Sequence, residues 1–181
     1  KPQKYKEITK IREDYLKKNK IALYAVHLPL DLHNKYGTNP QLCKILGLKN
    51  IKKFGKYHGK KIGYKGEFEE KKGIREIADL LNKKIKTKSQ IYIFKKRNVK
   101  TIGIVSGGGS DGIEDAVKEN IDCFITGDIN LASYNRAKDF GQNMVVAGHY
   151  ATETVGVKAL MPVLEKKFKV KTVFIDTPTK L

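Results

Sequence analysis

The chain has 181 residues, 40% of them hydrophobic and 31% charged, which is an ordinary composition for a soluble globular protein and enough to bury a core. It contains no apolar run of about 18 residues and no basic leader before an apolar stretch, so we expect neither a membrane span nor a signal peptide, and hence a cytoplasmic protein. Its net charge of +18 lies in residues 1–100, which carry 28 basic and 9 acidic side chains, against 9 and 10 in residues 101–181.

The first predicted elements are an amphipathic helix and a short apolar strand. Apolar residues at helical spacing predict a helix over residues 4–20, and the continuous apolar run of residues 21–27 predicts a buried strand. A loop follows, and then a helix that ends near Gly47. Residues 49–72 alternate lysine and glycine around aromatic residues, which indicates a loop or a solvent-facing hairpin.

From residue 73 onward, predicted helices and strands alternate. Helical spacing predicts a helix over residues 73–85, and residues 89–96 form a strand pattern. The same alternation continues through strand 101–107, helix 113–120, strand 122–127, helix 133–141, strand 143–149, helix 154–168 and strand 171–176. This order predicts an α/β fold whose sheet is covered by helices on both faces.

Two predicted strands run into the same motif, a histidine followed four residues later by an acid. The pairs are His27 with Asp31 and His149 with Glu153. Ligands of a parallel sheet bind beyond the carboxyl ends of its strands, where an imidazole and carboxylates can share a divalent cation. We therefore predict a metal pocket there, although a histidine considered alone is more often a hydrogen-bonded structural residue.

A glycine-rich turn follows one predicted strand and has two interpretations. Gly107, Gly109 and Gly112 form a GxGxxG pattern, and Asp128 ends the next strand where a ribose-binding acid would lie, as in a dinucleotide-binding half-domain. The helix after the turn opens with acidic residues, which would repel a pyrophosphate, and there is no GxxxxGK[ST] loop. A tight turn that lines the pocket is therefore favoured.

The segments around these motifs resemble one known family. The runs VSGGGSDGIEDAVKENIDCFITGD (residues 105–128) and NMVVAGHYATETVGVKAL (143–160), with HLPLD (27–31) before them, are similar to the Nif-three-like, dinuclear-metal-centre family, also called YbgI-type or GTP cyclohydrolase type two homologues. The resemblance covers nearly the whole chain. It implies a Nif-three-like α/β unit of two related lobes, here roughly residues 1–100 and 101–181, with two divalent metal ions between them and assembly into a homohexamer.

The resemblance also implies roles for individual residues. The family's metal ligands match Asp31, His149 and Glu153. Four further positions match residues that surround the metals: His27, Thr126, Gly127 and Asp128. The family also has a His-His pair upstream of the point where this chain begins. We therefore expect the N-terminal part of the family fold to be absent here and the metal site to be incomplete.

The lysine excess predicts a nucleic-acid-binding protein. A one-sided positive field concentrates a polyanion, and lysine makes point contacts to phosphate without reading bases. We expect binding of single- and double-stranded DNA or RNA with little sequence preference, with Tyr57 and Tyr64 stacking on a single strand. The surface would comprise the helix over residues 4–20 and Lys49, Lys52, Lys53, Lys56, Lys60 and Lys61.

Two other classes of function are alternatives. A metal-dependent hydrolase would use two bridged cations to lower the pKa of a water molecule. A homo-oligomeric scaffold would have neither activity. Self-association is expected in each case, because Phe54, Tyr57, Tyr64 and Phe68 lie on a segment with little local core and would anchor an interface.

Overall fold

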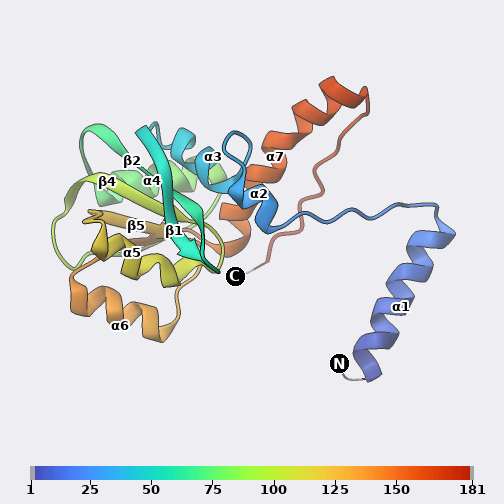
Figure 1. Ribbon diagram of the computed structural model, residues 1–181, viewed down its shortest axis with the longest axis horizontal. Coiled ribbons are helices and arrows are strands. Elements are labelled where there is room, and N and C mark those ends of the chain that lie inside the picture. Colours follow the sequence, from blue (N-terminus) through green and yellow to red (C-terminus); the bar gives the residue numbers. More distant parts are fainter. Residues whose placement is uncertain (1–2, 180–181) are drawn as a thin grey trace.

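The computed structural model describes residues 3–179, and its strands form one mixed sheet (Figure 1). In spatial order the strands are β1 (Lys49–Tyr57), β2 (Lys60–Gly73), β4 (Asn98–Val105), β5 (Cys123–Thr126), β6 (Asn143–Val146) and β3 (Gln90–Tyr92). β4, β5 and β6 are parallel, whereas β1, β2 and β3 pair antiparallel with their neighbours. The predicted α/β class is confirmed, with a parallel centre and antiparallel edges.

Helices cover both faces of the sheet, and each face buries its own apolar cluster. α3 (Thr38–Ile45), α4 (Ile74–Ile85) and α7 (His149–Phe168) contribute to the first cluster, and α5 (Ile113–Lys118) and α6 (Leu131–Phe140) to the second. Successive side chains of a strand point to opposite faces of the sheet, which explains why there are two clusters. In β4, Ile102 and Ile104 enter the first cluster and Val105 enters the second. Among the described residues, no helix is long and apolar enough to cross a membrane.

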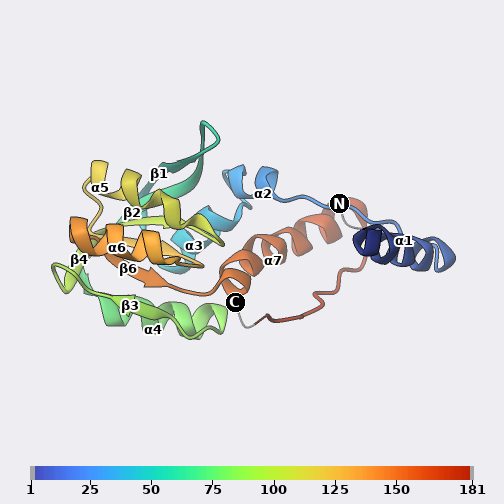
Figure 2. The ribbon, with the colours of Figure 1, turned by 90° about the horizontal axis from the view of Figure 1, so that it is seen from below.

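α1 (Gln3–Lys18) is the helix predicted at residues 4–20, and it stands apart from the sheet. Figures 1 and 2 show it reaching away from the body at the end of an extended connection. Its apolar side chains are exposed: Tyr5, Ile8, Ile11 and Tyr15. The apolar stripe that predicts this helix therefore has no packing partner in the part of the chain that the structure describes.

The strands predicted at residues 21–27 and 171–176 are wrong. Both segments lie outside the sheet, and their apolar side chains are open to solvent, with Tyr24 88% and Val173 78% exposed. Apolar content favours a strand only where a neighbouring strand supplies hydrogen bonds and a surface to pack on. Within residues 3–179, no strand pairs with either segment.

The lysine-rich segment at residues 49–72 is a hairpin of β1 and β2, which confirms one of its two interpretations. Its aromatic residues are not free to form an interface, which corrects the motive for self-association. Phe54, Tyr64 and Phe68 are 0%, 5% and 2% exposed, because the sheet and its covering helices bury them. Only Tyr57, with 46% exposure, remains on the surface.

The fold makes α4 a test of the core. Leu81 is fully buried in the first cluster, so Leu81→Ala is expected to lower the free energy of unfolding by about 2–5 kcal/mol through lost burial and a cavity. The exposed Lys83 lies on the same helix, and Lys83→Ala is expected to change the free energy of unfolding by less than about 0.5 kcal/mol. Urea unfolding measures both. Equal effects would contradict this packing.

Candidate metal centre

The turns after the parallel strands are joined by hydrogen bonds at one edge of the sheet. The Gly107 carbonyl, after β4, accepts from the amides of Gly127 (3.0 Å) and Asp128 (2.9 Å), after β5. The Gly107 amide donates to Oγ1 of Thr152 in the first turn of α7 (3.0 Å). Since these bonds join two strand ends to α7, the side chains that follow them are held in fixed relative positions.

Two of these positions require glycine. Gly107 has φ +59°, a left-handed conformation, and a Cβ there would meet the Glu153 carboxylate and the His149 ring. A Cβ on Gly127 would lie 2.6 Å from the Gly107 carbonyl oxygen. The glycine-rich turn therefore gives α7 room to bring its first side chains against β4.

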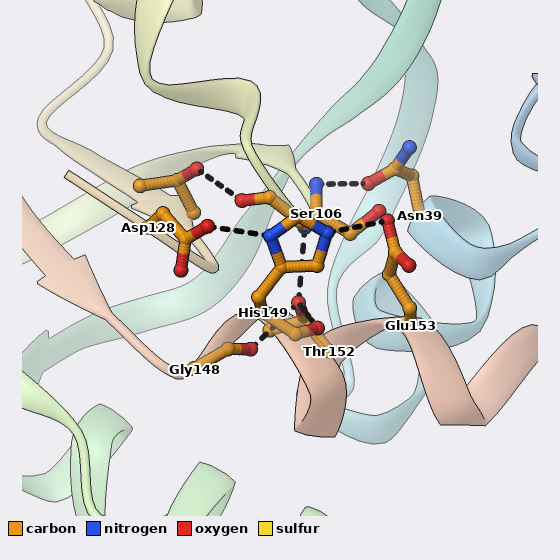
Figure 3. A network of polar contacts seen from close by, with 9 residues as sticks. Asn39, Ser106, Asp128, Gly148, His149, Thr152 and Glu153 are labelled. Carbon is orange, nitrogen blue, oxygen red and sulfur yellow. Dashed lines mark hydrogen bonds and ion pairs between the residues drawn. The ribbon is translucent and has the colours of Figure 1, made fainter. Parts of the chain in front are cut away.

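His149 is held between two carboxylates (Figure 3). Its Nδ1 lies 2.5 Å from Oδ2 of Asp128, and its Nε2 lies 3.3 Å from Oε1 of Glu153, one helical turn along α7. A carboxylate at Nδ1 fixes the orientation of the ring and leaves Nε2 facing the cavity. Asp128 therefore acts on the cavity through His149.

The two carboxylates change the ionisation of His149. Burial lowers the pKa of this imidazole, but the hydrogen bond with Asp128 and the negative charges of Glu153 and Asp128 outweigh that effect. The pKa of His149 therefore lies above the ordinary value for histidine. Such a ring binds a proton more readily than an ordinary histidine does.

Asp31 reaches the same region from α2 (Leu28–Leu32) and is almost completely buried. Burial raises the pKa of its carboxyl group above the ordinary value, although a hydrogen bond from Thr38 and the charge of His27 act in the opposite direction. A cation beside this carboxylate would offset the cost of burying its charge.

One cavity of about 220 Å³ brings the predicted ligands together. His27, Asp31, His149 and Glu153 all line it, together with the glycine-rich turn. Among residues 3–179, no three His, Cys, Asp or Glu side chains lie close enough as they stand to hold one ion. The donor types suit a divalent cation: Asp31 lines the same cavity as the adjacent pair His149 and Glu153.

The triplet of Thr126, Gly127 and Asp128 lies behind the cavity and does not line it. Thr126 is fully buried and its hydroxyl donates to the Gly107 carbonyl (3.3 Å), while Gly127 and Asp128 line a neighbouring cavity. These residues position the cavity wall. Sequence reasoning missed Thr152, whose place before Glu153 in the same motif was the available signal.

The other two histidines have separate environments. Nδ1 of His33 accepts from the amides of Lys35 and Tyr36, both at 3.1 Å, which makes it part of a turn. His58 is exposed at the tip of the hairpin and contacts Tyr57. Neither lines the cavity.

The mixed sheet and the cavity beyond its parallel strands define an α/β protein with a ligand crevice at the carboxyl edge. Residues 1–180 match the family model of Duf34/NIF3 (NGG1p interacting factor 3). The chain belongs to the DUF34/NIF3 family.

Curated relatives agree with this assignment. A "GTP cyclohydrolase 1 type 2 homolog" of Pyrococcus horikoshii is 52% identical over 162 residues, which cover 89% of this chain and 64% of the relative. A protein with the same name from Archaeoglobus fulgidus is 34% identical, with 96% of this chain and 69% of the relative covered. The chain thus spans about two thirds of the length of these relatives.

Solved structures share the fold. The structure of TTHA1606 from Thermus thermophilus has a TM-score of 0.85 and 34% identity, covering 95% of this chain and 67% of that one. The structure of protein ybgI, described as of unknown function, has a TM-score of 0.83 and 29% identity, covering 91% and 65%. The Nif-three-like fold expected from the sequence is confirmed.

The pairing of His149 with Asp128 predicts a measurable pKa change. Asp128→Asn keeps the shape of the side chain but removes a negative charge at Nδ1, so the pKa of His149 is expected to fall. A proton NMR titration of the imidazole measures it. The control Asp139→Asn changes an exposed carboxylate on α6 and leaves the titration unchanged. An unaltered pKa in Asp128→Asn would contradict this geometry.

Proposed function

We propose that the cavity between α2 and α7 binds divalent metal ions and serves metal-dependent hydrolysis. The main support is the lining of one small cavity by an imidazole and two carboxylates from distant parts of the chain: His149, Glu153 and Asp31. These donors suit several divalent cations, which would supply a water molecule of lowered pKa and polarise a substrate when bound. Asp128 would orient His149 so that Nε2 becomes the ligand atom.

The names of the curated relatives support hydrolysis as the reaction class. The curated relatives carry the name of a cyclohydrolase homologue. Two ions need more ligands than Asp31, His149 and Glu153 provide, and the His-His pair that the family resemblance implies stays a prediction. His27 lines the cavity and would contact ligands or water beside Asp31.

Lys56 gives this cavity a preference for anionic substrates. It is the only Lys or Arg among the described residues that line the cavity, and it projects from β1 while its amide donates to Asp115 (2.7 Å). A fixed backbone beside a free ammonium group suits a phosphate or carboxylate of the substrate.

Metal content tests the first proposal. His149→Ala and Glu153→Gln each remove a donor atom, and bound metal at limiting concentration is expected to fall by about tenfold or more, as elemental analysis measures. The matched control His33→Ala removes an imidazole that only orders a turn and leaves metal content unchanged. Full stoichiometry in His149→Ala would place the metal elsewhere.

The second candidate function is nucleic-acid binding by the lysine-rich hairpin. All six predicted lysines are exposed: Lys49, Lys52, Lys53, Lys56, Lys60 and Lys61. The hairpin places like charges directly opposite each other, Lys52 with Lys65 and Lys56 with Lys61, which destabilises a strand pair. Glu119 compensates part of this charge, at 2.7 Å from Lys65 and 3.7 Å from Lys61. A phosphate backbone would compensate the remainder, which supports this function.

The stacking predicted for the aromatic residues needs correction. Tyr64 is 5% exposed and its hydroxyl donates to Asn34 (2.8 Å), so it cannot stack on a base. Tyr57 keeps an accessible ring at the end of β1, next to the hairpin turn.

Charge reversal tests nucleic-acid binding. Replacing the six hairpin lysines by Glu is expected to abolish a gel shift. A variant that reverses the other five and keeps Lys56, which lines the metal cavity, is expected to leave metal content unchanged. Since lysine contacts phosphate through charge, the affinity of unmodified protein should fall with a log–log salt slope of about −0.9 per contacted phosphate.

A control separates this surface from total charge. Six exposed lysines of the neutral half are reversed in the same way: Lys138, Lys158, Lys166, Lys167, Lys169 and Lys171. This variant should retain the shift. The proposal is wrong if unmodified protein gives no shift at low salt or if both variants lose binding equally.

The homohexamer implied by the family resemblance stays a prediction. The hairpin aromatics do not support self-association, because three of the four are buried. The exposed apolar stripe of α1 does, since a second copy could cover it.

A further inference from the structure

A groove of about 650 Å³ runs beside β3, at the opposite edge of the sheet from the hairpin. Three cationic side chains line it: Arg75 from α4, and Lys95 and Arg97 from the loop between β3 and β4. The groove shares none of its described lining residues with the metal cavity, so it is a separate site.

Arginine is scarce in this chain and is concentrated here. Only four of the 37 basic residues are arginines, and two of them, Arg75 and Arg97, line this groove. A guanidinium group binds an oxyanion through a planar fork of donors, whereas an ammonium group is a point charge. Arginine in a lysine-rich chain therefore indicates recognition of a phosphate by geometry.

The three cations of the groove have no anionic partner among the described residues. No acid lines the groove, and none of the three forms an ion pair. Glu76, beside Arg75, is instead held by Lys72 at 2.6 Å. Arg75 also lies in the first turn of α4, where the helix dipole disfavours a cation. An anion in the groove would offset the repulsion among the three cations and the unfavourable effect of the helix dipole on Arg75.

The loop that carries Lys95 and Arg97 is fixed before any ligand arrives. Oδ1 of Asn143, which is 2% exposed, accepts from the amides of Phe94 (2.9 Å) and Lys95 (3.0 Å). The Arg97 carbonyl accepts from the amide of Ile74, the first residue of α4 (3.0 Å). One part of the loop is thus held by the buried Asn143 side chain and its end by the backbone of α4, so little backbone conformational entropy is lost on binding.

Apart from Ser89, the remaining lining of the groove is apolar. Ile91, Ile93 and Phe94 are half-buried there, and the volume lies within the usual range of small-molecule sites, well above that of a single phosphate. We propose that this groove binds a nucleoside phosphate, with its phosphates on Arg75 and Arg97 and its base against the apolar residues. The nucleoside phosphate would be a free nucleotide or a unit of a nucleic-acid strand.

Titration with a fluorescent nucleoside triphosphate tests the proposal, with inorganic pyrophosphate as competitor. Arg75→Lys and Arg97→Lys keep the charge but lose the fork, and each is expected to weaken binding by about tenfold or more. The six-lysine hairpin variant should bind within about twofold of unmodified protein, because its changes lie at the other edge. Absence of saturable binding, or normal binding by both Arg→Lys variants, overturns the proposal.

Two further experiments identify the source of the phosphate and separate a loss of binding from a loss of folding. A short single-stranded oligonucleotide that displaces the probe, and does so less well in Arg97→Lys, assigns the site to nucleic acid. A strand that fails to displace the probe assigns it to free nucleotide. Lys95→Ala removes an exposed ammonium without touching the hydrogen-bonded backbone, and it should weaken binding while the far-ultraviolet spectrum is retained. Unchanged affinity accompanied by aggregation would mean that these cations only protect the β3 edge, which also overturns the proposal.

Discussion

The main-chain junction at Gly107 is the constraint on which the candidate metal centre depends. One carbonyl receives two amides from the turn after β5, and the amide of the same residue donates to α7. The junction requires a left-handed glycine, because any Cβ would collide with the two side chains that the junction positions, His149 and Glu153. Backbone geometry and ligand geometry are therefore set by the same few atoms. The rest of the sheet holds β4, β5 and β6 in parallel so that their ends can meet there.

The spacing of residues in the sequence was sufficient to predict those elements that bury one of their own faces. α4 follows from apolar spacing, and the spacing of His149 and Glu153 places both on one side of α7. Residues 21–27 have the composition of a strand, yet pairing is a tertiary property and no partner strand is present in residues 3–179. Asp31 was placed by a motif and a resemblance, and its burial depends on α2 packing beside the hairpin. The groove at β3 could not be predicted, because Arg75 and Arg97 are brought together by the pairing of β2 with β4 and the bond from the Ile74 amide to the Arg97 carbonyl, which are tertiary features.

Positive charge has two physical forms in this molecule. The hairpin presents solvated lysines around an accessible tyrosine, an arrangement that acts over a distance set by salt. The groove at β3 presents Arg97 on a fixed loop and Arg75 on α4 beside apolar side chains, an arrangement suited to directed contacts. Lys56 belongs to the hairpin and also lines the metal cavity, so the long-range field continues into the candidate catalytic site. Net charge alone would have hidden this division.

The order of strands in the sheet differs from their order in the chain, and this affects how the chain folds while it is being synthesised. β3 is made before β4, but among the described strands it pairs with β6 alone, so residues 90–92 stay unpaired until residue 146 has left the ribosome. Closing that long loop is a late, entropically costly event. During this interval the nascent chain exposes an apolar strand flanked by Lys95, Lys96 and Arg97, whose charges discourage pairing with other chains. Lys95 and Arg97, which line the groove in the folded protein, thus also act on the growing polypeptide.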